Sequence, residues 1–165
     1  MKALRIPALL LGVAAAAFYV PASAQQLNAH FSCGETHEDV GLKSFLTDTG
    51  TIKLNGNTIE EFYWESSVFH SSHGLECSID QGDGLQAEFI GEEQRQAWRV
   101  MLQDPAAARA RRGYGISERL NCTVRIERTG DAVHVAPSCP ALCGSRRNFT
   151  EFSFDVKSGK CRYDD

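Results

Sequence analysis

The first residues whose types and spacing could do chemistry are two histidines, His70 and His73, in the segment His70-Ser71-Ser72-His73. Imidazoles three residues apart on a helix or a turn can share a metal ion. This segment, however, follows an alternating run that predicts a strand, and no second half of a metal motif such as H-E-x-x-H accompanies it. The pattern predicts an exposed loop whose histidines are candidate binding residues, and no metal site.

The second candidate is the stretch 139–148, which reads CPALCGSRRN. Two cysteines fix this loop, which then presents Ser145, Arg146 and Arg147. Guanidinium groups on a rigid loop make good contacts to carboxylates or sugars. The alternative is that the cysteines are structural and the arginines are only solvated. We predict that these three residues belong to a binding site, as do the two histidines.

Catalytic and cofactor motifs are missing from the sequence. No G-x-S-x-G nucleophile motif occurs, and an even number of cysteines in an exported chain argues against a free thiol nucleophile. Gly82, Gly84 and Ala87 fit the spacing G-x-G-x-x-A, but a strand is predicted to follow where a dinucleotide site needs a helix. The same segment lacks the glutamate of a calcium loop, since its twelfth position is Gly91. We expect no cofactor and name no catalytic residue.

The N-terminus has the three parts of a secretory signal peptide. Lys2 and Arg5 are followed by an uncharged apolar stretch, residues 6–20, and then by the small-residue cleavage site Pro21-Ala22-Ser23-Ala24. The apolar stretch is shorter than the roughly 20 residues of a membrane-spanning helix. We predict cleavage after this site, no membrane span after cleavage, and a single domain, residues 25–165, in the periplasm or outside the cell.

The charge of the exported part bears on its partners. Of 17 Lys and Arg residues, two lie in the leader, which leaves 15 against 21 acidic residues and a net charge of −6. An acidic chain is a poor ligand for nucleic acids, because phosphate backbones bind basic faces. The charge would suit a basic periplasmic or cell-wall protein as partner. Alternatively, it only keeps a small exported domain soluble.

The cysteines of the exported part predict a disulfide framework, because their number is even. All six lie beyond the leader: Cys33, Cys77, Cys122, Cys139, Cys143 and Cys161. Cys122 and Cys139 bracket a predicted hairpin that turns at residues 129–131, and they would lie almost opposite each other. This geometry favours a bridge between Cys122 and Cys139.

The other cysteines have no such geometric guide in the sequence. Elimination pairs Cys33 with Cys77 and Cys143 with Cys161, and a local Cys139–Cys143 bridge is the alternative. We expect each native bridge to stabilise the fold by about 2–4 kcal/mol, mainly by restricting the unfolded chain.

Apolar residues recur with a period of two through most of the exported part. Phe62 and Trp64 form one such run, and Phe152 and Phe154 form another. This is the pattern of antiparallel strands that bury one face. Turn sequences rich in glycine separate the runs: Asn55-Gly56-Asn57, Asp80-Gln81-Gly82-Asp83-Gly84, Thr129-Gly130-Asp131 and Lys157-Ser158-Gly159-Lys160. His134 lies between two valines of such a run and is predicted to face solvent.

These patterns predict a mostly β domain, an antiparallel meander of about eight strands that forms a barrel or a sandwich. Disulfides staple this domain, and it has one or two short helices. The segment 104–113 predicts a helix with Asp104 as N-cap, Pro105 in the first turn, arginines in the last turn and Gly113 at the end. The segment Glu38 to Leu46 is the second helical candidate.

The plan of the chain resembles that of the small periplasmic lysozyme inhibitors of Gram-negative bacteria, with a leader, an acidic β-rich body and cysteine staples. The resemblance is one of class, because the Ser-Gly-x-x-Tyr loop of that group is matched neither by Ser72-His73-Gly74 nor by Gly144-Ser145-Arg146. The stapled body, the acidic charge and the missing catalytic motifs predict a non-catalytic binding or inhibitor protein. The alternatives are a small exported hydrolase that uses His70 or His73, and a structural envelope protein without a ligand.

Overall fold

The computed structural model describes residues 25–39, 41–92, 94–115, 120–139, 142–144 and 147–164. The predicted leader lies outside these ranges, as do two of the predicted binding residues, Ser145 and Arg146. Within these ranges, no helix is long and apolar enough to cross a membrane.

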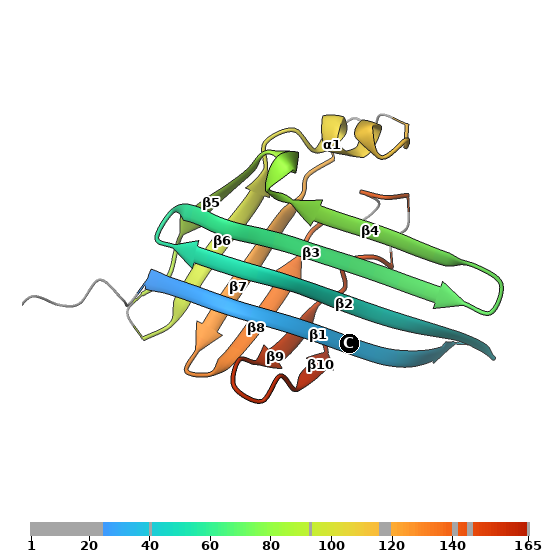
Figure 1. Cartoon of the computed structure of the whole chain (residues 1–165), viewed down its shortest axis with the longest axis horizontal. Helices are drawn as coiled ribbons and strands as arrows, with labels where there is room; N and C mark the ends of the chain where they lie inside the picture. The colour runs from blue at the N-terminus through green and yellow to red at the C-terminus, as the bar shows by residue number, and fades with distance from the viewer. Residues whose placement is uncertain are drawn as a thin grey trace, which may run out of the picture.

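Ten strands form two antiparallel sheets in the described chain (Figure 1). The first sheet has the order β1-β2-β3-β4, with β1 (Gln26–Asp39), β2 (Leu42–Asn55), β3 (Thr58–His70) and β4 (Gly74–Asp80). The second has the order β10-β9-β8-β7-β6-β5, with β5 (Leu85–Phe89), β6 (Gln96–Leu102), β7 (Thr123–Thr129), β8 (Ala132–Pro137), β9 (Phe152–Asp155) and β10 (Cys161–Tyr163). Within each sheet, strands that follow one another along the chain are paired, so each sheet is a meander.

The two sheets pack face to face, with the long strands of the first crossing the shorter strands of the second (Figure 1). The prediction of a mostly β, antiparallel fold is confirmed, and of its two forms the sandwich fits, because the sheets do not close into a barrel. The described residues form ten strands rather than about eight.

The predicted helix over Glu38 to Leu46 is wrong, because this segment is the turn end of the long β1–β2 hairpin. The turn uses Gly41 at a φ of 77°. Alternation is present in β2, but two of its inward positions carry the polar residues Ser44 and Asp48, which are both buried. Polar residues at core positions hide the period of two from a sequence pattern based on hydrophobicity.

The predicted helix in segment 104–113 is confirmed as α1 (Pro105–Arg111). The Asp104 carboxylate accepts a hydrogen bond from the Ala107 N–H at 2.8 Å, which caps the helix. Gly113, at a φ of 81°, lies just beyond its end. A short 3-10 helix, η2 (Gln81–Asp83), connects β4 to β5.

A clamp joins the end of α1 to the first sheet. The Arg112 guanidinium donates to the Asp83 carboxylate, with a distance of 2.9 Å from Nη1 to Oδ1, and to the Ser78 carbonyl of β4. Burial alone would raise the pKa of Asp83, but the bonds from Arg112 and from the Asp80 N–H hold that pKa below its ordinary value. The clamp therefore fixes the connection between β6 and β7 against the first sheet.

The core between the sheets is aromatic at its centre. Phe31 of β1 lies 5.0 Å from Phe152 of β9 between ring centroids, and Trp64 of β3 lies 5.6 Å from Phe152. Gly50 of β2 makes room for this packing, because a Cβ there would lie 2.6 Å from the Phe31 ring and 2.3 Å from the Tyr63 carbonyl oxygen. The aromatic rings thus hold the two sheets together at the level of Gly50.

Three disulfides staple the domain, and one of the predicted bridges is confirmed. Cys122–Cys139 forms as the hairpin geometry predicted. The pairs Cys33–Cys77 and Cys143–Cys161 are wrong, as is the alternative Cys139–Cys143, because the bridges are Cys33–Cys161 and Cys77–Cys143. Elimination favoured cysteines close in the chain, whereas these bridges join the first sheet to the C-terminal third of the chain.

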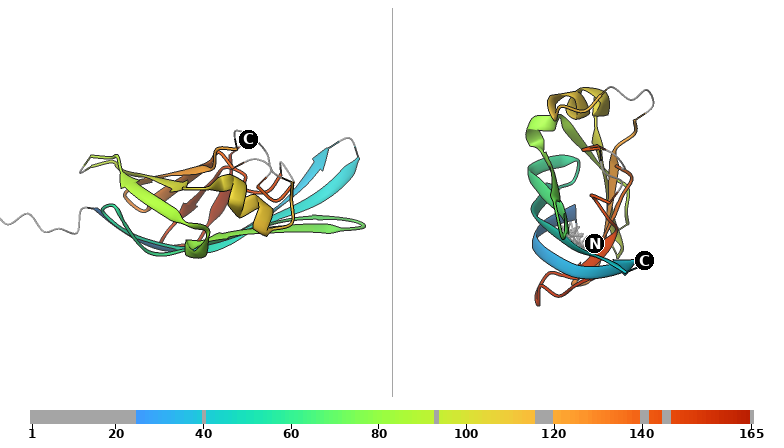
Figure 2. Two further views of the ribbon diagram at one scale, coloured as in Figure 1. Left: turned by 90° about the horizontal axis from the view of Figure 1, so that it is seen from above. Right: turned by 90° about the vertical axis from the view of Figure 1, so that its right-hand side faces the viewer.

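The two bridges from the first sheet start at the same level. Cys33, Asp48, Ser66 and Cys77 are successive register partners across β1, β2, β3 and β4. Beyond this row the strands continue past the second sheet (Figures 1 and 2). We call this part the projecting end and define it as residues 35–39, 41–45 and 67–76.

Asp48 lies at the centre of this row and is fully buried. Its carboxylate accepts hydrogen bonds from Trp64 Nε1 at 2.7 Å and from the Tyr163 hydroxyl at 2.9 Å. Burial raises the pKa of Asp48, and the hydrogen bonds from Trp64, Ser66 and Tyr163 oppose this rise without cancelling it. A buried carboxylate therefore links β2 and β3 to the end of the chain.

Candidate functional site

A groove of about 660 Å³ opens at the projecting end. Its described lining comes from the β1–β2 turn, the β3–β4 turn and the loop between β8 and β9. These residues are Gly41, Leu42, Lys43, His70, Ser71, Ser72, His73 and Arg147. Three of the residues predicted from sequence, His70, His73 and Arg147, therefore line one groove. The other two, Ser145 and Arg146, lie outside the described ranges.

The β3–β4 turn holds the two histidines close together. The His70 N–H donates to the His73 carbonyl at 2.8 Å, and the two ring centroids lie 4.9 Å apart. Ser72 Oγ lies 3.0 Å from His73 Nδ1. A tight main-chain turn thus places two imidazoles and a hydroxyl side by side at the groove.

The loop that carries Arg147 is anchored to the first sheet immediately after that residue. Asn148 Nδ2 donates to the Ser66 carbonyl at 2.7 Å and to the Leu75 carbonyl at 3.3 Å, and the Phe149 N–H donates to Ser66 Oγ at 2.8 Å. The Cys77–Cys143 bridge attaches the same loop from its other side. These bonds fix the backbone beside the groove.

Two costly features mark this anchor. Phe149 has a φ of 59°, in the left-handed region that side chains with a Cβ rarely adopt. The Asn148 Oδ1 atom is buried, and no described atom donates a hydrogen bond to it. Such strain persists only where the surroundings impose it, and it concentrates at functional sites. The strained backbone of Phe149 and the Asn148 Oδ1 atom without a described hydrogen-bond donor are therefore local free-energy costs, which the rest of the fold offsets in holding the loop in this position.

The described side chains of the groove favour an anionic ligand. Lys43 and Arg147 carry positive charge, His70 and His73 offer ring nitrogens, and none of the described lining residues is acidic. Lys43 lies 3.6 Å from Glu38, which is outside the lining. Arg147 Nη1 lies 3.4 Å from Ser44 Oγ, a contact that directs the guanidinium along the inner face of the sheet. A planar guanidinium with nearby imidazoles suits a carboxylate.

Exposed apolar side chains gather at the projecting end, and one of them, Leu42, lines the groove. Among the described residues, the large apolar or aromatic side chains with the most exposure are Leu42, Phe45, Tyr63 and Phe69, at 74%, 44%, 39% and 44%. Leu42, Phe45 and Phe69 lie at the projecting end, and Phe45 and Phe69 are register partners on its outer face. Clustered exposed hydrophobic residues mark interaction surfaces, whereas single ones do not.

Acidic side chains gather farther along the outer face, around Tyr63. The Tyr63 hydroxyl donates to Glu65 at 2.6 Å. This bond, with burial and the nearby charges of Glu65, Glu76 and Asp80, raises the pKa of Tyr63 to about 12. We call Glu65, Glu76 and Asp80 the acidic strip, and it is a place on the acidic domain where a basic partner would be attracted.

A second depression, of about 620 Å³, lies between the β2–β3 turn and β5 and β6. Several of its polar side chains are used by the fold itself. Asn57 Oδ1 accepts a hydrogen bond from the Phe89 N–H at 2.7 Å, and Gln81 Nε2 donates to the Ile59 carbonyl at 3.2 Å. The first bond joins the two sheets and the second holds η2 on the first sheet, so this depression is a weaker candidate than the groove.

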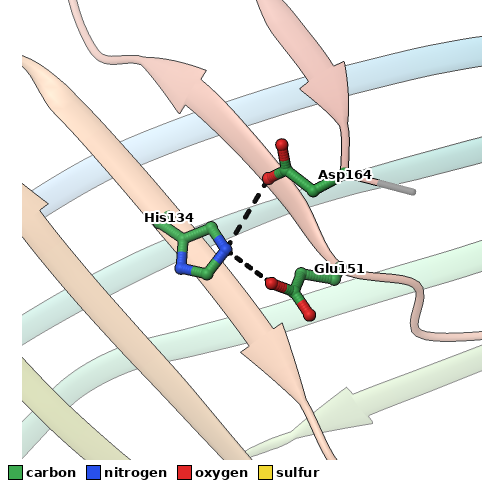
Figure 3. A group of neighbouring side chains, drawn as sticks. All are labelled: His134, Glu151 and Asp164. Carbon is green, nitrogen blue, oxygen red and sulfur yellow. Dashed lines mark hydrogen bonds and ion pairs between the residues drawn. The ribbon is translucent and has the colours of Figure 1, made fainter.

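A separate cluster on the outer face of the second sheet consists of His134, Glu151 and Asp164 (Figure 3). His134 is partly exposed, as predicted for its position between two inward-facing valines. Its Nε2 atom lies 2.8 Å from Glu151 Oε1 and 3.6 Å from Asp164 Oδ2. The hydrogen bond from Ser153, aided by Arg162, keeps the pKa of Asp164 below its ordinary value.

Sequence reasoning missed Leu42 and Lys43 of the groove and the whole His134 cluster. Alternation in the sequence was a usable signal for the cluster, because each of its residues follows or precedes a buried apolar or aromatic residue: Val133 and Val135 for His134, Phe152 for Glu151 and Tyr163 for Asp164. It could not show the register that brings the three together. Comparisons of the chain with known protein families, with curated proteins and with solved structures found no match.

Proposed function

We propose that this protein is an exported, non-catalytic binding protein of the inhibitor type, which holds a partner protein at the projecting end. The observation that carries this proposal is that the projecting end combines the groove, with its cationic and imidazole side chains and exposed Leu42, with exposed Phe45 and Phe69 on its outer face. Interfaces combine buried apolar anchors with a few placed polar groups, and the projecting end offers both. Export is supported by the N-terminal leader pattern and by three disulfides.

The group we expect in the groove is a carboxylate of the partner, either a side chain or a chain end. Arg147 would pair with it in the fork geometry of a guanidinium, and His70 and His73 would add hydrogen bonds. The basic character predicted for the partner would act elsewhere, at the acidic strip. A basic protein of the periplasm or cell wall that presents one carboxylate to the groove would meet both requirements, a carboxylate at the groove and a basic surface at the acidic strip.

The hydrolase alternative rests on the contact between Ser72 and His73 at 3.0 Å. In a nucleophile–base pair a third group orients the base, usually a carboxylate. Among the described residues no carboxylate forms an ion pair or hydrogen bond with His73. A binding role for His73 therefore has more support than a role as general base.

A defined probe tests the groove directly. We expect an acetylated tripeptide with a free C-terminal carboxylate to shift the NMR signals of His70 and His73. The same tripeptide with an amidated C-terminus should shift these signals at least about tenfold less at equal concentration. Arg147→Ala should remove the shifts. Arg99→Ala, which alters an exposed arginine of the second sheet, is the matched control and should keep them.

Capture of partners from a periplasmic extract tests the proposal at the level of proteins. The oxidised wild type and Arg99→Ala should retain the same protein, and the variant H70A/H73A/R147A should lose it. Reversal of the acidic strip, by Glu65→Lys with Glu76→Lys, should weaken capture of a basic partner in low salt. Hydrolysis of peptide or ester substrates that disappears in Ser72→Ala would replace the binding proposal by the hydrolase alternative.

A further inference from the structure

The His134 cluster is built on main-chain pairing rather than on flexible loops. His134 of β8 is the register partner of Ser153 in β9, and Ser153 is the partner of Arg162 in β10. Glu151 lies just before β9 and Asp164 just after β10, and the Asp164 N–H donates to the Glu151 carbonyl at 3.1 Å. The backbones that carry the three side chains are therefore fixed relative to one another.

The three side chains converge on one point of the outer face (Figure 3). One potential ligand atom from each of them lies within 4.8 Å of the other two. Zinc–ligand bonds of about 2.0–2.2 Å in a tetrahedral site place ligand atoms about 3.4 Å apart. The distances from His134 Nε2, 2.8 Å to Glu151 and 3.6 Å to Asp164, lie on either side of this value. Small rotations of the Glu151 side chain would make room for an ion.

The neighbours of the cluster orient one of its carboxylates. Ser153 Oγ donates to Asp164 Oδ2 at 2.7 Å, and Arg162 Nη2 donates to Asp164 Oδ1 at 2.9 Å. Metal sites commonly hold their ligating carboxylates by such outer hydrogen bonds, which reduce the cost of fixing the ligand. Two carboxylates against one guanidinium also leave a net negative charge beside the imidazole.

We propose that His134, Glu151 and Asp164 bind a divalent transition-metal ion of the zinc type. One imidazole nitrogen and two carboxylate oxygens are a donor set that zinc accepts, whereas calcium prefers six or more oxygen ligands. The partly exposed side chains leave a fourth position of the ion open to solvent. The ion would join β8 to the two segments that flank β9 and β10. The site is independent of the groove and of the proposed partner.

Zinc titration of the oxidised protein without any affinity tag tests this site. We expect one equivalent of zinc to bind at the cluster in the wild type. His134→Ala, Glu151→Gln and Asp164→Asn should each weaken this binding by at least about tenfold. The visible absorption of bound Co²⁺ should show four- or five-fold coordination in the wild type and should be lost in His134→Ala. Circular dichroism of each variant checks that the fold is kept.

Two histidine controls separate this site from other imidazoles. His30 is exposed on the first sheet beside Thr51, and His30→Ala should leave zinc affinity unchanged. The variant H70A/H73A should retain the equivalent of zinc that His134 holds. Absence of zinc binding in the wild type would overturn the proposal, as would zinc that survives His134→Ala or that is lost only in H70A/H73A.

Discussion

The groove and the His134 cluster hold their polar side chains in position by different means. At the groove, two turns and a loop meet, and a disulfide, side-chain bonds and a strained residue fix their positions. At the cluster, the strand register of β8, β9 and β10 places the side chains, with one main-chain bond beyond the strands. Perturbations of loops should therefore damage the groove and spare the cluster.

The difference also concerns what surrounds each site. The groove lies at the projecting end, which extends past the second sheet (Figure 2). The projecting end also exposes the apolar side chains of Leu42, Phe45 and Phe69. The cluster lies over the sandwich itself, on a face backed by the aromatic core. The groove suits a partner that covers apolar surface, whereas the cluster suits a small ion.

Removal of the Cys77–Cys143 bridge is the change with the largest expected effect. The variant C77A/C143A should lose about 4 kcal/mol in the free energy of unfolding, because the bridge closes a loop with a sequence separation of 66 residues. Groove affinity for the carboxylate probe should fall at least about tenfold, and zinc affinity at the cluster should stay within about twofold. Urea unfolding and the two titrations measure these quantities.

The variant C122A/C139A is the matched control for this prediction. Its bridge closes a loop with a sequence separation of only 17 and connects the two ends of the β7–β8 hairpin. We expect a smaller loss of stability, about 3 kcal/mol, and no loss of groove affinity. If probe affinity at the groove and zinc affinity at the cluster fell equally in C77A/C143A, the two regions would not be independent.

Asn148→Ala should have the next largest effect. The substitution removes two hydrogen bonds from the anchor and leaves the carbonyls of Ser66 and Leu75 without them. We expect a loss of about 2 kcal/mol in stability and a severalfold loss of groove affinity, with zinc binding unchanged. Chemical denaturation and probe titration measure both. Thr150→Ala, which removes a single exposed bond to the Arg147 carbonyl, is the milder control.

The fold class was predictable from the sequence because alternation survives wherever core positions are apolar. The register partners Phe62 and Ile52 show it plainly, as do Phe152 and Val135. The long β1–β2 hairpin was missed where polar Ser44 and Asp48 occupy core positions. Their burial depends on partners far along the chain, such as Tyr163 for Asp48, which local patterns do not show.

The candidate sites were predictable to different degrees, because local patterns show residues that are close in the chain but not contacts between distant segments. His70 and His73 share a local turn, and the loop with Arg147 has a visible cysteine pair, so residue types alone drew attention to them. Their meeting at one groove depends on the Cys77–Cys143 bridge, which elimination did not predict. The His134 cluster depends on the register of three strands, and register follows from packing across the sandwich rather than from spacing.

Arg147→Lys should have a moderate effect that is confined to the groove. Lysine keeps the positive charge but loses the planar fork of the guanidinium, so we expect the carboxylate probe to bind about fivefold more weakly. Stability and zinc affinity should stay within error. Calorimetric titration measures the change. An unchanged affinity in Arg147→Lys would show that only charge, and not geometry, attracts the probe.

The smallest expected effect concerns Asp48, whose bonding partners lie next to residues of both the groove and the cluster. Its hydroxyl donor Tyr163 precedes Asp164 of the cluster, and its partner Ser66 anchors the groove loop. Because burial raises its pKa in the folded state, the folded protein binds the Asp48 proton more tightly than the unfolded chain does. The contribution of Asp48 to stability should therefore increase as the pH falls from neutral through the raised pKa, and level off below the ordinary value of about 3.8.

Asp48→Asn isolates this contribution, because all other titrating groups are common to both proteins. The free energy of unfolding of the wild type minus that of Asp48→Asn should become more positive as the pH falls from neutral. Thermal or urea unfolding across that range measures the difference. A difference that shrinks on acidification would mean that the hydrogen bonds of Trp64 and Tyr163 outweigh burial. In that case Asp48 would stabilise the row between Cys33 and Cys77 as a charged group.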